Sequence, residues 1–327
     1  MTTTLRTLDL RLPDGRRLRA YDSGPDVGYV GVGPADGARA EASSASPGSA
    51  ATDDSDHPDA RPGSPGLVAV WCHGTPNLGM PPEPLMRVAR ESGLRWVGYD
   101  RPGYGGSDAR PGRTVASAGG DVEVVLDALG AERCVVVGHS GGGPHALAAA
   151  AALPDRVAAA VVLSGLAPRD APGLDWYAGM SSAGRAVLAS AERGRADRLA
   201  FVEPDDADPV FVLRDLQALD GPWSWFMTVV RPALAGDPSG AADDDIAYVT
   251  PWGFDVDAVR APVLLVHGGS DLIAPLPHAR WLADHLPDAE LWAEPRDGHI
   301  SVLHRGDDAV RWAARTAGVL PAEAARS

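Results

Sequence analysis

The distribution of hydrophobic residues divides the chain into a short alternating start and a long, regular remainder. Residues 7–12 and 17–21 alternate in part between apolar and polar side chains, and Pro13-Asp14-Gly15 lies between them, which predicts a β-hairpin. From residue 67 onward, short continuous apolar runs alternate with segments in which apolar residues recur at helical spacing. Continuous apolar strands that alternate with helices are typical of a parallel sheet covered on both faces.

The individual elements can be located from the same pattern. The apolar runs predict strands at residues 67–72, 95–99, 134–137, 157–163, 263–267 and 290–293. Helices are expected at residues 84–92, 115–129, 143–153, 276–286 and 307–319. Together with the hairpin, these elements predict an α/β fold with a mostly parallel, eight-stranded sheet. Ligands of such sheets bind outside the carboxyl ends of the strands, so catalytic residues are expected in the loops that follow strands.

Two regions interrupt this alternation. Residues 24–66 consist mainly of Gly, Ala, Ser, Pro and Asp, which cannot bury enough apolar surface to offset the entropy of ordering, so we expect a disordered insertion. Residues 167–257 contain no clear strand pattern, and we expect a mostly helical cap inserted between strands six and seven. The predicted parts are a hairpin of the core (1–23), the insertion (24–66), the first part of the core (67–166), the cap (167–257) and the second part of the core (258–327).

Composition and charge exclude several classes of function. The formal net charge of −15 repels the phosphates of nucleic acids, so no nucleic-acid partner is expected. No apolar run approaches the roughly 20 residues that a membrane-spanning helix needs, and the N-terminus has no leader-like pattern, so we expect a cytoplasmic protein without a membrane anchor. Cys72 and Cys134 border apolar runs and are expected to be buried thiols. No Cys/His spacing matches a zinc site, and we expect neither a metal nor a cofactor.

A serine nucleophile is indicated between the strand that ends near residue 137 and the helix that begins near residue 143. The sequence Gly138-His139-Ser140-Gly141-Gly142 fits the pattern G-x-S-x-G in the strand–turn–helix context that a nucleophile elbow requires. Such a turn is so tight that the residues two positions before and after the serine must be very small. The helix N-terminus that follows the serine favours negative charge there.

A serine hydroxyl needs a base, and the base needs an acid that orients it. In this strand–helix arrangement the expected chain order is Ser, then Asp or Glu, then His. Asp271 lies in the loop after one late strand and His299 in the loop after the next, so both loops should open at the sheet edge that carries Ser140. Alternatives remain nearby: Asp297 or Glu294 as the acid, and His304 as the base.

The oxyanion hole needs two backbone amides that point toward the developing charge. One is expected from Gly141, directly after the nucleophile, and the other from the loop after the third strand. That loop reads His73-Gly74-Thr75-Pro76, and because proline has no amide hydrogen, Thr75 is the expected second donor. His73 is expected to brace the loop, and a structural role is likewise expected for His139, His145 and His267.

These segments together resemble the α/β-hydrolase superfamily, in the serine-nucleophile branch with a helical cap, which includes esterases, proline iminopeptidases and cofactor-free haloperoxidases. The matching segments lie at residues 73–76, 100–108, 138–142, 268–271 and 298–299, so the resemblance spans residues 67 to 320. It implies that residues 100–108 form a scaffold loop beside the site. A serine nucleophile excludes the dehalogenase and epoxide-hydrolase branches, which use an aspartate. The insertion at 24–66 departs from the tight connection that is usual in the family.

The cap should determine the substrate, which we expect to be a small molecule. Four aromatic residues are expected either to line an apolar pocket or to pack the cap on the core: Trp176, Trp223, Trp225 and Phe226. An acidic run, composed of Glu203, Asp205, Asp206 and Asp208, could bind a free amino group or form a solvated loop. We expect an esterase for a small or medium apolar substrate. The alternatives are a proline iminopeptidase-like aminopeptidase and a non-catalytic, ligand-binding homologue.

Overall fold

The computed structural model describes residues 5–24, 67–202, 204 and 208–321, and the predicted insertion at 24–66 lies outside them except for Gly24. An eight-stranded sheet forms the centre of the fold, with the strand order β1-β2-β4-β3-β5-β6-β7-β8. The strands are β1 (Arg6–Arg11), β2 (Arg17–Asp22), β3 (Val68–Cys72), β4 (Arg95–Tyr99), β5 (Cys134–His139), β6 (Val157–Leu163), β7 (Val263–Gly268) and β8 (Ala289–Glu294). Strands β3 to β8 run parallel, whereas β1 and β2 form the predicted antiparallel hairpin, and β2 also pairs antiparallel with β4. The predicted fold class is therefore confirmed.

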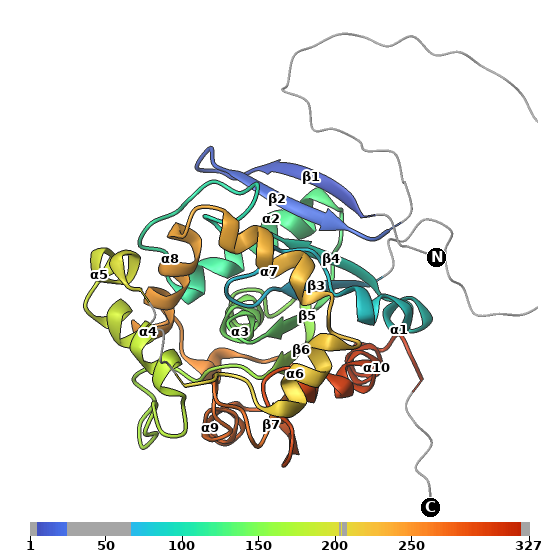
Figure 1. Ribbon diagram of the computed structural model, residues 1–327. Coiled ribbons are helices and arrows are strands. Elements are labelled where there is room, and N and C mark those ends of the chain that lie inside the picture. The colour runs from blue at the N-terminus through green and yellow to red at the C-terminus, as the bar shows by residue number, and fades with distance from the viewer. Residues whose placement is uncertain (1–4, 25–66, 203, 205–207, 322–327) are drawn as a thin grey trace, which may run out of the picture.

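Helices cover both faces of the sheet (Figure 1). The core helices are α1 (Met86–Glu91), α2 (Ala118–Ala128), α3 (Gly142–Ala152), α9 (Pro277–His285) and α10 (Gly306–Thr316), with short 3-10 turns η1 (Glu83–Leu85), η2 (Val115–Ser117), η3 (Val256–Ala258) and η4 (Ser301–Arg305). Val136 in β5 belongs to the buried cluster that includes residues of α2, α3 and α9, whereas Val135 and Val137 belong to the cluster that includes residues of α1 and α10. Because both faces are buried, every residue of β5 is buried, which explains the apolar run at residues 134–137.

The two cysteines lie inside this core. Cys72 and Cys134 are buried free thiols, as the sequence predicts. Burial raises the pKa of each to about 12, so both thiols stay protonated at neutral pH.

Five α-helices lie in the described residues between β6 and β7, where the sequence predicts a cap. They are α4 (Ser182–Glu192), α5 (Arg195–Ala200), α6 (Leu213–Asp220), α7 (Phe226–Ala235) and α8 (Ser239–Val249), drawn from yellow-green to orange in Figure 1. We call this group of helices the cap. None of the helices in the described parts of the chain combines the length and the apolarity needed to cross a bilayer.

Candidate active site

Ser140 lies on a tight, strained turn between β5 and α3. Its φ of 56° is in the left-handed region, which is rare for a residue other than glycine and is a form of backbone strain found at functional sites. A Cβ at Gly142 would lie 1.9 Å from the carbonyl oxygen of Cys72, and one at Gly138 would lie 2.2 Å from the carbonyl oxygen of Gly142. Only glycine fits at these two positions, as the nucleophile-elbow pattern requires.

His299 and Asp271 meet at the carboxyl ends of β8 and β7. The Nδ1 atom of His299 lies 2.8 Å from Oδ2 of Asp271. The other oxygen of Asp271 accepts hydrogen bonds from the amides of Ile273 and Ala274, at 2.8 and 2.9 Å. Burial alone would raise the pKa of Asp271, but the His299 ring outweighs burial and lowers it below its usual value. The carboxylate is therefore ionised and fixed, as an acid that orients a histidine must be.

The alternative residues have other partners. Asp297 lies 3.0 Å from Arg214 and 3.3 Å from His304, while Glu294 pairs with Arg305 at 2.5 Å. Ligand atoms of Glu294, Asp297 and His304 lie within 4.8 Å of one another, which is close enough to hold a metal ion. Arginines already neutralise both carboxylates, however, so this donor set does not favour a cation.

The main chain of His299 is held at two further points. Its amide donates to Oδ2 of Asp215 on α6, at 3.2 Å, and its carbonyl oxygen lies 3.3 Å from Nε2 of His139. Burial lowers the pKa of His139 to about 3, so this ring is neutral and can donate from Nε2.

Ser140 and His299 both belong to the described residues, and no hydrogen bond joins the serine hydroxyl to the imidazole in this state. Catalytic hydrogen bonds often tighten only when substrate binds.

Thr75 and Gly141 lie with Ser140 in the lining of one cavity. Their backbone amides have no hydrogen-bond acceptor among the described residues, which leaves both available to an oxygen that develops negative charge. The Thr75 side chain is fixed by α8, because its hydroxyl donates to Oδ2 of Asp244 at 2.6 Å and lies 2.8 Å from the Tyr248 hydroxyl. Tyr248 in turn donates to the Gly141 carbonyl at 3.1 Å, so one cap helix contacts both predicted amide donors.

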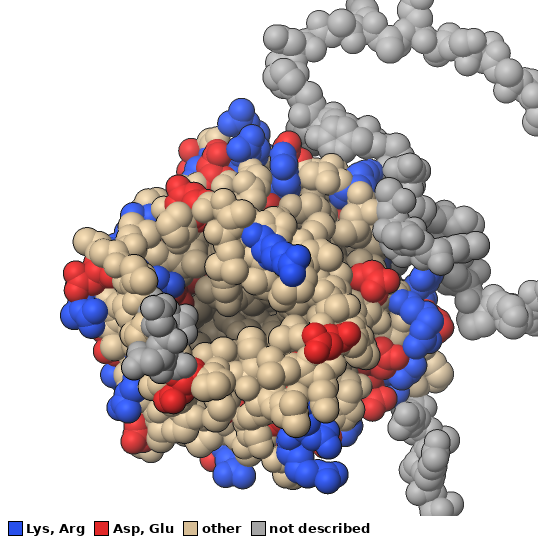
Figure 2. All heavy atoms as spheres, viewed as in Figure 1, with Lys and Arg blue, Asp and Glu red and all other residues tan. Residues whose placement is uncertain are grey.

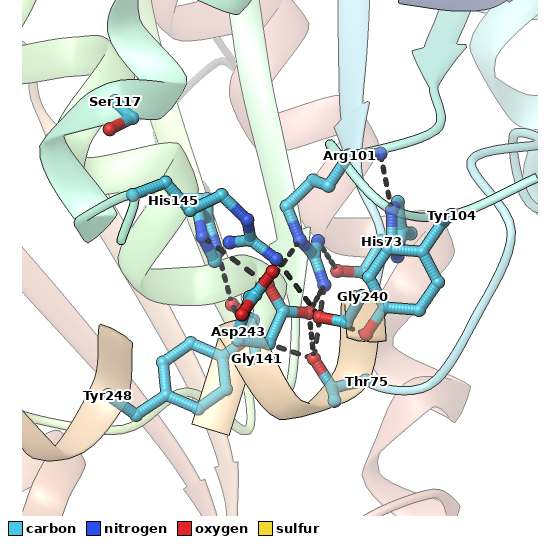
Figure 3. Close-up of polar contacts among 12 residues, drawn as sticks. His73, Thr75, Arg101, Tyr104, Ser117, Gly141, His145, Gly240, Asp243 and Tyr248 are labelled. Atoms are coloured by element: carbon cyan, nitrogen blue, oxygen red, sulfur yellow. Dashed lines mark hydrogen bonds and ion pairs between the residues drawn. The ribbon is translucent and has the colours of Figure 1, made fainter. Parts of the chain in front are cut away.

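Asp244 is the centre of this polar network. Arg101 binds it through two nitrogens, at 3.1 and 2.6 Å, and Arg113 binds it at 2.5 Å. Tyr104 donates to the same carboxylate at 2.8 Å. Burial alone would raise the pKa of Asp244, but the two guanidinium groups hold it well below its usual range. Figure 3 shows Arg101 and His145 on opposite sides of the cluster, with Thr75 and Tyr248 below them in this view.

Two histidines brace these loops, in agreement with the structural roles expected from the sequence. Nε2 of His73 accepts from the Arg101 amide at 3.0 Å, and its Nδ1 donates to the Gly74 carbonyl at 2.7 Å. Nδ1 of His145 lies 2.7 Å from the carbonyl of Gly141. Arg101 also donates to the carbonyls of His73 and Gly74, which supports the prediction that residues 100–108 form a scaffold.

The cavity beside Ser140 has a volume of about 180 Å³ and is mainly aliphatic. Its apolar lining comprises Leu166, Ala183, Val187, Leu188, Val210, Ile273 and Ala274. One carboxylate, that of Asp245 on α8, also lines it, and this carboxylate is ion-paired with Arg198 at 2.6 Å. Figure 2 shows the face that carries the cap hollowed near its centre, with mostly uncharged residues around the hollow.

The aromatic residues considered for the substrate pocket are placed elsewhere. Trp176, Trp223, Trp225 and Phe226 are all absent from the lining of this cavity. Trp223 and Phe226 are buried in the core cluster that includes α1 and α10, and Trp225 packs against it. Trp176 is buried and donates to the carbonyl of Ala167 at 2.8 Å. Of the two roles expected for these rings, the structure favours packing: none of the four lines the cavity, whose walls are mainly aliphatic.

The acidic run is only partly described. Glu203, Asp205 and Asp206 lie outside the described residues. Asp208 is described, and it accepts a hydrogen bond from the exposed hydroxyl of Ser182 at 2.5 Å.

The sequence did not single out Asp215, Asp244 or Asp245, since acidic residues in a helical segment usually face solvent. A signal was present in the run Asp243-Asp244-Asp245, because three consecutive residues point in different directions around a helix and cannot all face water.

Known proteins with similar sequences or folds identify the family of this chain. A family model described as the alpha/beta hydrolase fold matches residues 70–305. A pimeloyl-acyl-carrier-protein methyl ester esterase of Aromatoleum aromaticum is 33% identical over 234 residues, which cover 66% of this chain and 85% of that protein. A non-heme chloroperoxidase of Streptomyces lividans is 29% identical over 223 residues, covering 64% of this chain and 76% of that protein.

Two solved structures agree over almost the whole chain. The bromoperoxidase from Bacillus anthracis superposes with a TM-score of 0.60 at 18% identity, covering 98% of this chain and 100% of that one. The esterase from Exiguobacterium antarcticum gives 0.58 at 17% identity, covering 96% and 100%. With the family model matching most of its length, this chain belongs to the α/β-hydrolase fold family.

Proposed function

We propose that this protein hydrolyses carboxylic esters of small apolar substrates through Ser140, His299 and Asp271. The observation that carries the proposal is the position of Ser140. It lies on a strained turn at the wall of an aliphatic cavity, together with Thr75 and Gly141, whose amides have no acceptor in the described part of the chain. The fixed pair of His299 and Asp271 supplies a base at the same edge of the sheet, and one relative in the family is an esterase.

The mechanism is acyl transfer in two steps. His299 takes the proton of the Ser140 hydroxyl as the oxygen attacks the ester carbonyl, and Asp271 stabilises the imidazolium that forms. The amides of Thr75 and Gly141 donate to the oxyanion. His299 then gives the proton to the departing alcohol, which leaves an acyl group on Ser140. A water molecule, deprotonated by His299, attacks this acyl-enzyme and releases the acid.

The size and polarity of the cavity favour a small ester over a peptide. Pockets for drug-sized ligands measure about 300–1,000 Å³, whereas this one measures about 180 Å³. An aminopeptidase needs an unpaired carboxylate to bind the substrate ammonium. Asp245 is paired with Arg198, and Asp208 bonds to Ser182 at the surface, so neither described carboxylate favours that alternative.

Comparing wild type with Ser140→Ala on p-nitrophenyl acetate tests this proposal. The variant should lose roughly 10³-fold or more in kcat, because no nucleophile remains to form the acyl-enzyme. Ser164→Ala is the matched control, since Ser164 has a φ of 52°, close to that of Ser140, but is buried and does not line the cavity. Equal rates for wild type and Ser140→Ala would favour the non-catalytic, ligand-binding alternative.

A series of p-nitrophenyl esters tests the proposed substrate size. Turnover should be highest for acetyl to butyryl esters and fall for longer chains. Leu188→Ala enlarges the cavity and should raise kcat/KM for longer esters by about fourfold for each methylene that becomes buried. Leu216→Ala, which truncates an exposed leucine on α6, is the control and should leave the chain-length profile unchanged. If aminoacyl-naphthylamides were cleaved faster than all esters, the aminopeptidase alternative would replace the esterase.

A further inference from the structure

Asp215 is a buried carboxylate of the cap that the mechanism above does not use. It lies in the first turn of α6 and is only 1% exposed. It makes no ion pair with an arginine among the described residues. A buried carboxylate is costly unless hydrogen bonds satisfy it, so the identity of its donors indicates its role.

The donors of Asp215 come mainly from the segment that begins at His299. Oδ1 accepts from the amides of Ile300 and Ser301, at 2.9 and 2.8 Å, and from the Ser301 hydroxyl at 2.8 Å. Oδ2 accepts from the amide of His299 at 3.2 Å, and also from the amide of Val212 at the start of α6, at 3.2 Å. Apart from Val212, all these groups belong to three consecutive residues of the core.

Gly298 gives a second observation of the same contact. A Cβ on this residue would lie 2.1 Å from Oδ2 of Asp215 and 2.7 Å from its Cγ. The hydrogen bonds just described hold that carboxylate, so it cannot move aside freely. The glycine that precedes His299 is therefore explained by the close approach of a cap side chain, and not by a left-handed backbone, because its φ is not among the positive values of the chain.

We propose that Asp215 is a positioning residue, which fixes the backbone of His299 from the cap while Asp271 fixes its ring. The proposal rests on the proposed hydrolase function. Asp271 binds Nδ1 of the ring at 2.8 Å, and this contact alone leaves the imidazole free to swing with its main chain. The hydrogen bonds of Asp215 to residues 299–301 remove that freedom. The cap thus orders the base of the reaction as well as covering the substrate cavity.

Asp215→Ala tests the proposal through turnover per active site. An acyl-burst titration with p-nitrophenyl acetate counts the sites that can react, and kcat is then expressed per titrated site. We expect kcat to fall about 10- to 100-fold, as for a catalytic group displaced by about 1 Å, with KM changed less than about twofold. Asp215→Asn retains one acceptor oxygen for Ile300 and Ser301 and should recover part of the loss. Gly298→Ala, which displaces the carboxylate without removing it, should lower kcat in the same way.

Arg214→Ala is the matched control. Arg214 precedes Asp215 on α6 and contacts the same loop through Asp297 at 3.0 Å, but its side chain is 49% exposed. It should keep kcat within about twofold of wild type. A purely structural role for Asp215 would lower the number of titratable sites and the melting temperature, but leave kcat per site unchanged, and that result would overturn the proposal.

Hydrogen exchange supplies a readout that does not depend on catalysis. In Asp215→Ala the amides of residues 299–301 should lose at least about tenfold in protection, whereas Arg214→Ala should leave them protected. Unchanged protection in Asp215→Ala would overturn the proposal.

If Ser140→Ala and wild type hydrolyse esters alike, it is the proposed function that fails. If Ser140→Ala is inactive while Asp215→Ala keeps its kcat per site, only the assignment of Asp215 fails.

Discussion

Two buried aspartates of the cap contact the two halves of the candidate site, and they are stabilised in different ways. Asp244 on α8 contacts the oxyanion side and is neutralised by Arg101 and Arg113. Asp215 on α6 contacts the histidine side and is satisfied by backbone amides and the hydroxyl of Ser301. Both carboxylates are almost completely buried. A cap can therefore be joined to a catalytic core either by charge pairing or by amide hydrogen bonds.

The two solutions should differ in what they contribute. A buried ion pair is costly to form because both charges lose their hydration. Removing one partner destabilises the protein strongly, because the other charge then stays buried and unpaired. Amide donors carry no net charge, and a carboxylate that accepts them fixes the positions of particular backbone atoms. We therefore expect the Asp244 cluster to matter most for stability and Asp215 to matter most for the geometry of His299.

The largest predicted effect on stability follows from removing the carboxylate of Asp244. Asp244→Ala leaves Arg101 and Arg113 as buried, unpaired cations, which should lower the free energy of unfolding by about 3–5 kcal/mol. Chemical denaturation followed by fluorescence measures this loss. If the Ala variant does not fold, Asp244→Asn allows the same measurement, because it keeps the size of the side chain and removes the charge.

Asp243→Ala is the control for this prediction. Asp243 is adjacent on α8, but its partner Arg195 is 37% exposed, so its loss should cost within about 1 kcal/mol. Equal losses for Asp243→Ala and Asp244→Ala would contradict the distinction between the two sides of the site.

The fold and the tight turn at Ser140 could be predicted because their signals are local. The apolar run at residues 134–137 and the glycines at 138 and 142 are imposed by burial and by a tight turn, and both constraints act within a few residues. The chain order placed Asp271 and His299 in loops at one sheet edge, where the structure brings them within 2.8 Å. The contact between His299 and Ser140 stays a prediction.

The contributions of the cap could not be read from the sequence. Asp215 and His299 are 84 positions apart, and Thr75 and Asp244 are 169 apart, so no periodicity connects them. The four aromatic residues were equally compatible with a pocket or with packing, because both environments bury rings. For Trp223, Trp225 and Phe226, only the packing of α6 and α7 on the core decides between these roles.

The pH dependence of stability can sharpen the comparison on the oxyanion side. His145 and Asp244 both belong to that side, but their protonation affects the free energy of unfolding in different pH ranges. Burial, followed by the charge of Arg101, lowers the pKa of His145 to about 3. The charged groups that face this ring are Arg101, Arg113 and Asp244, and the Tyr248 ring packs against it. The unfolded chain binds a proton at His145 below a pH of about 6.5, whereas the folded protein does not until about pH 3. Stability should therefore fall as the pH decreases through this window.

His145→Gln should remove this contribution to acid sensitivity, which is smaller than the predicted effect of Asp244→Ala. Between pH 6 and 4, unfolding free energies of wild type should fall more steeply than those of the variant, by up to about 1.4 kcal/mol per pH unit. Asp244 does not obscure the difference, because its lowered pKa confines its own loss of stability to pH values below its ordinary value of 3.8. His285→Gln, an exposed histidine on α9, is the control. Parallel pH profiles for wild type and His145→Gln would show that His145 is not the buried, neutral partner of the Asp244 cluster.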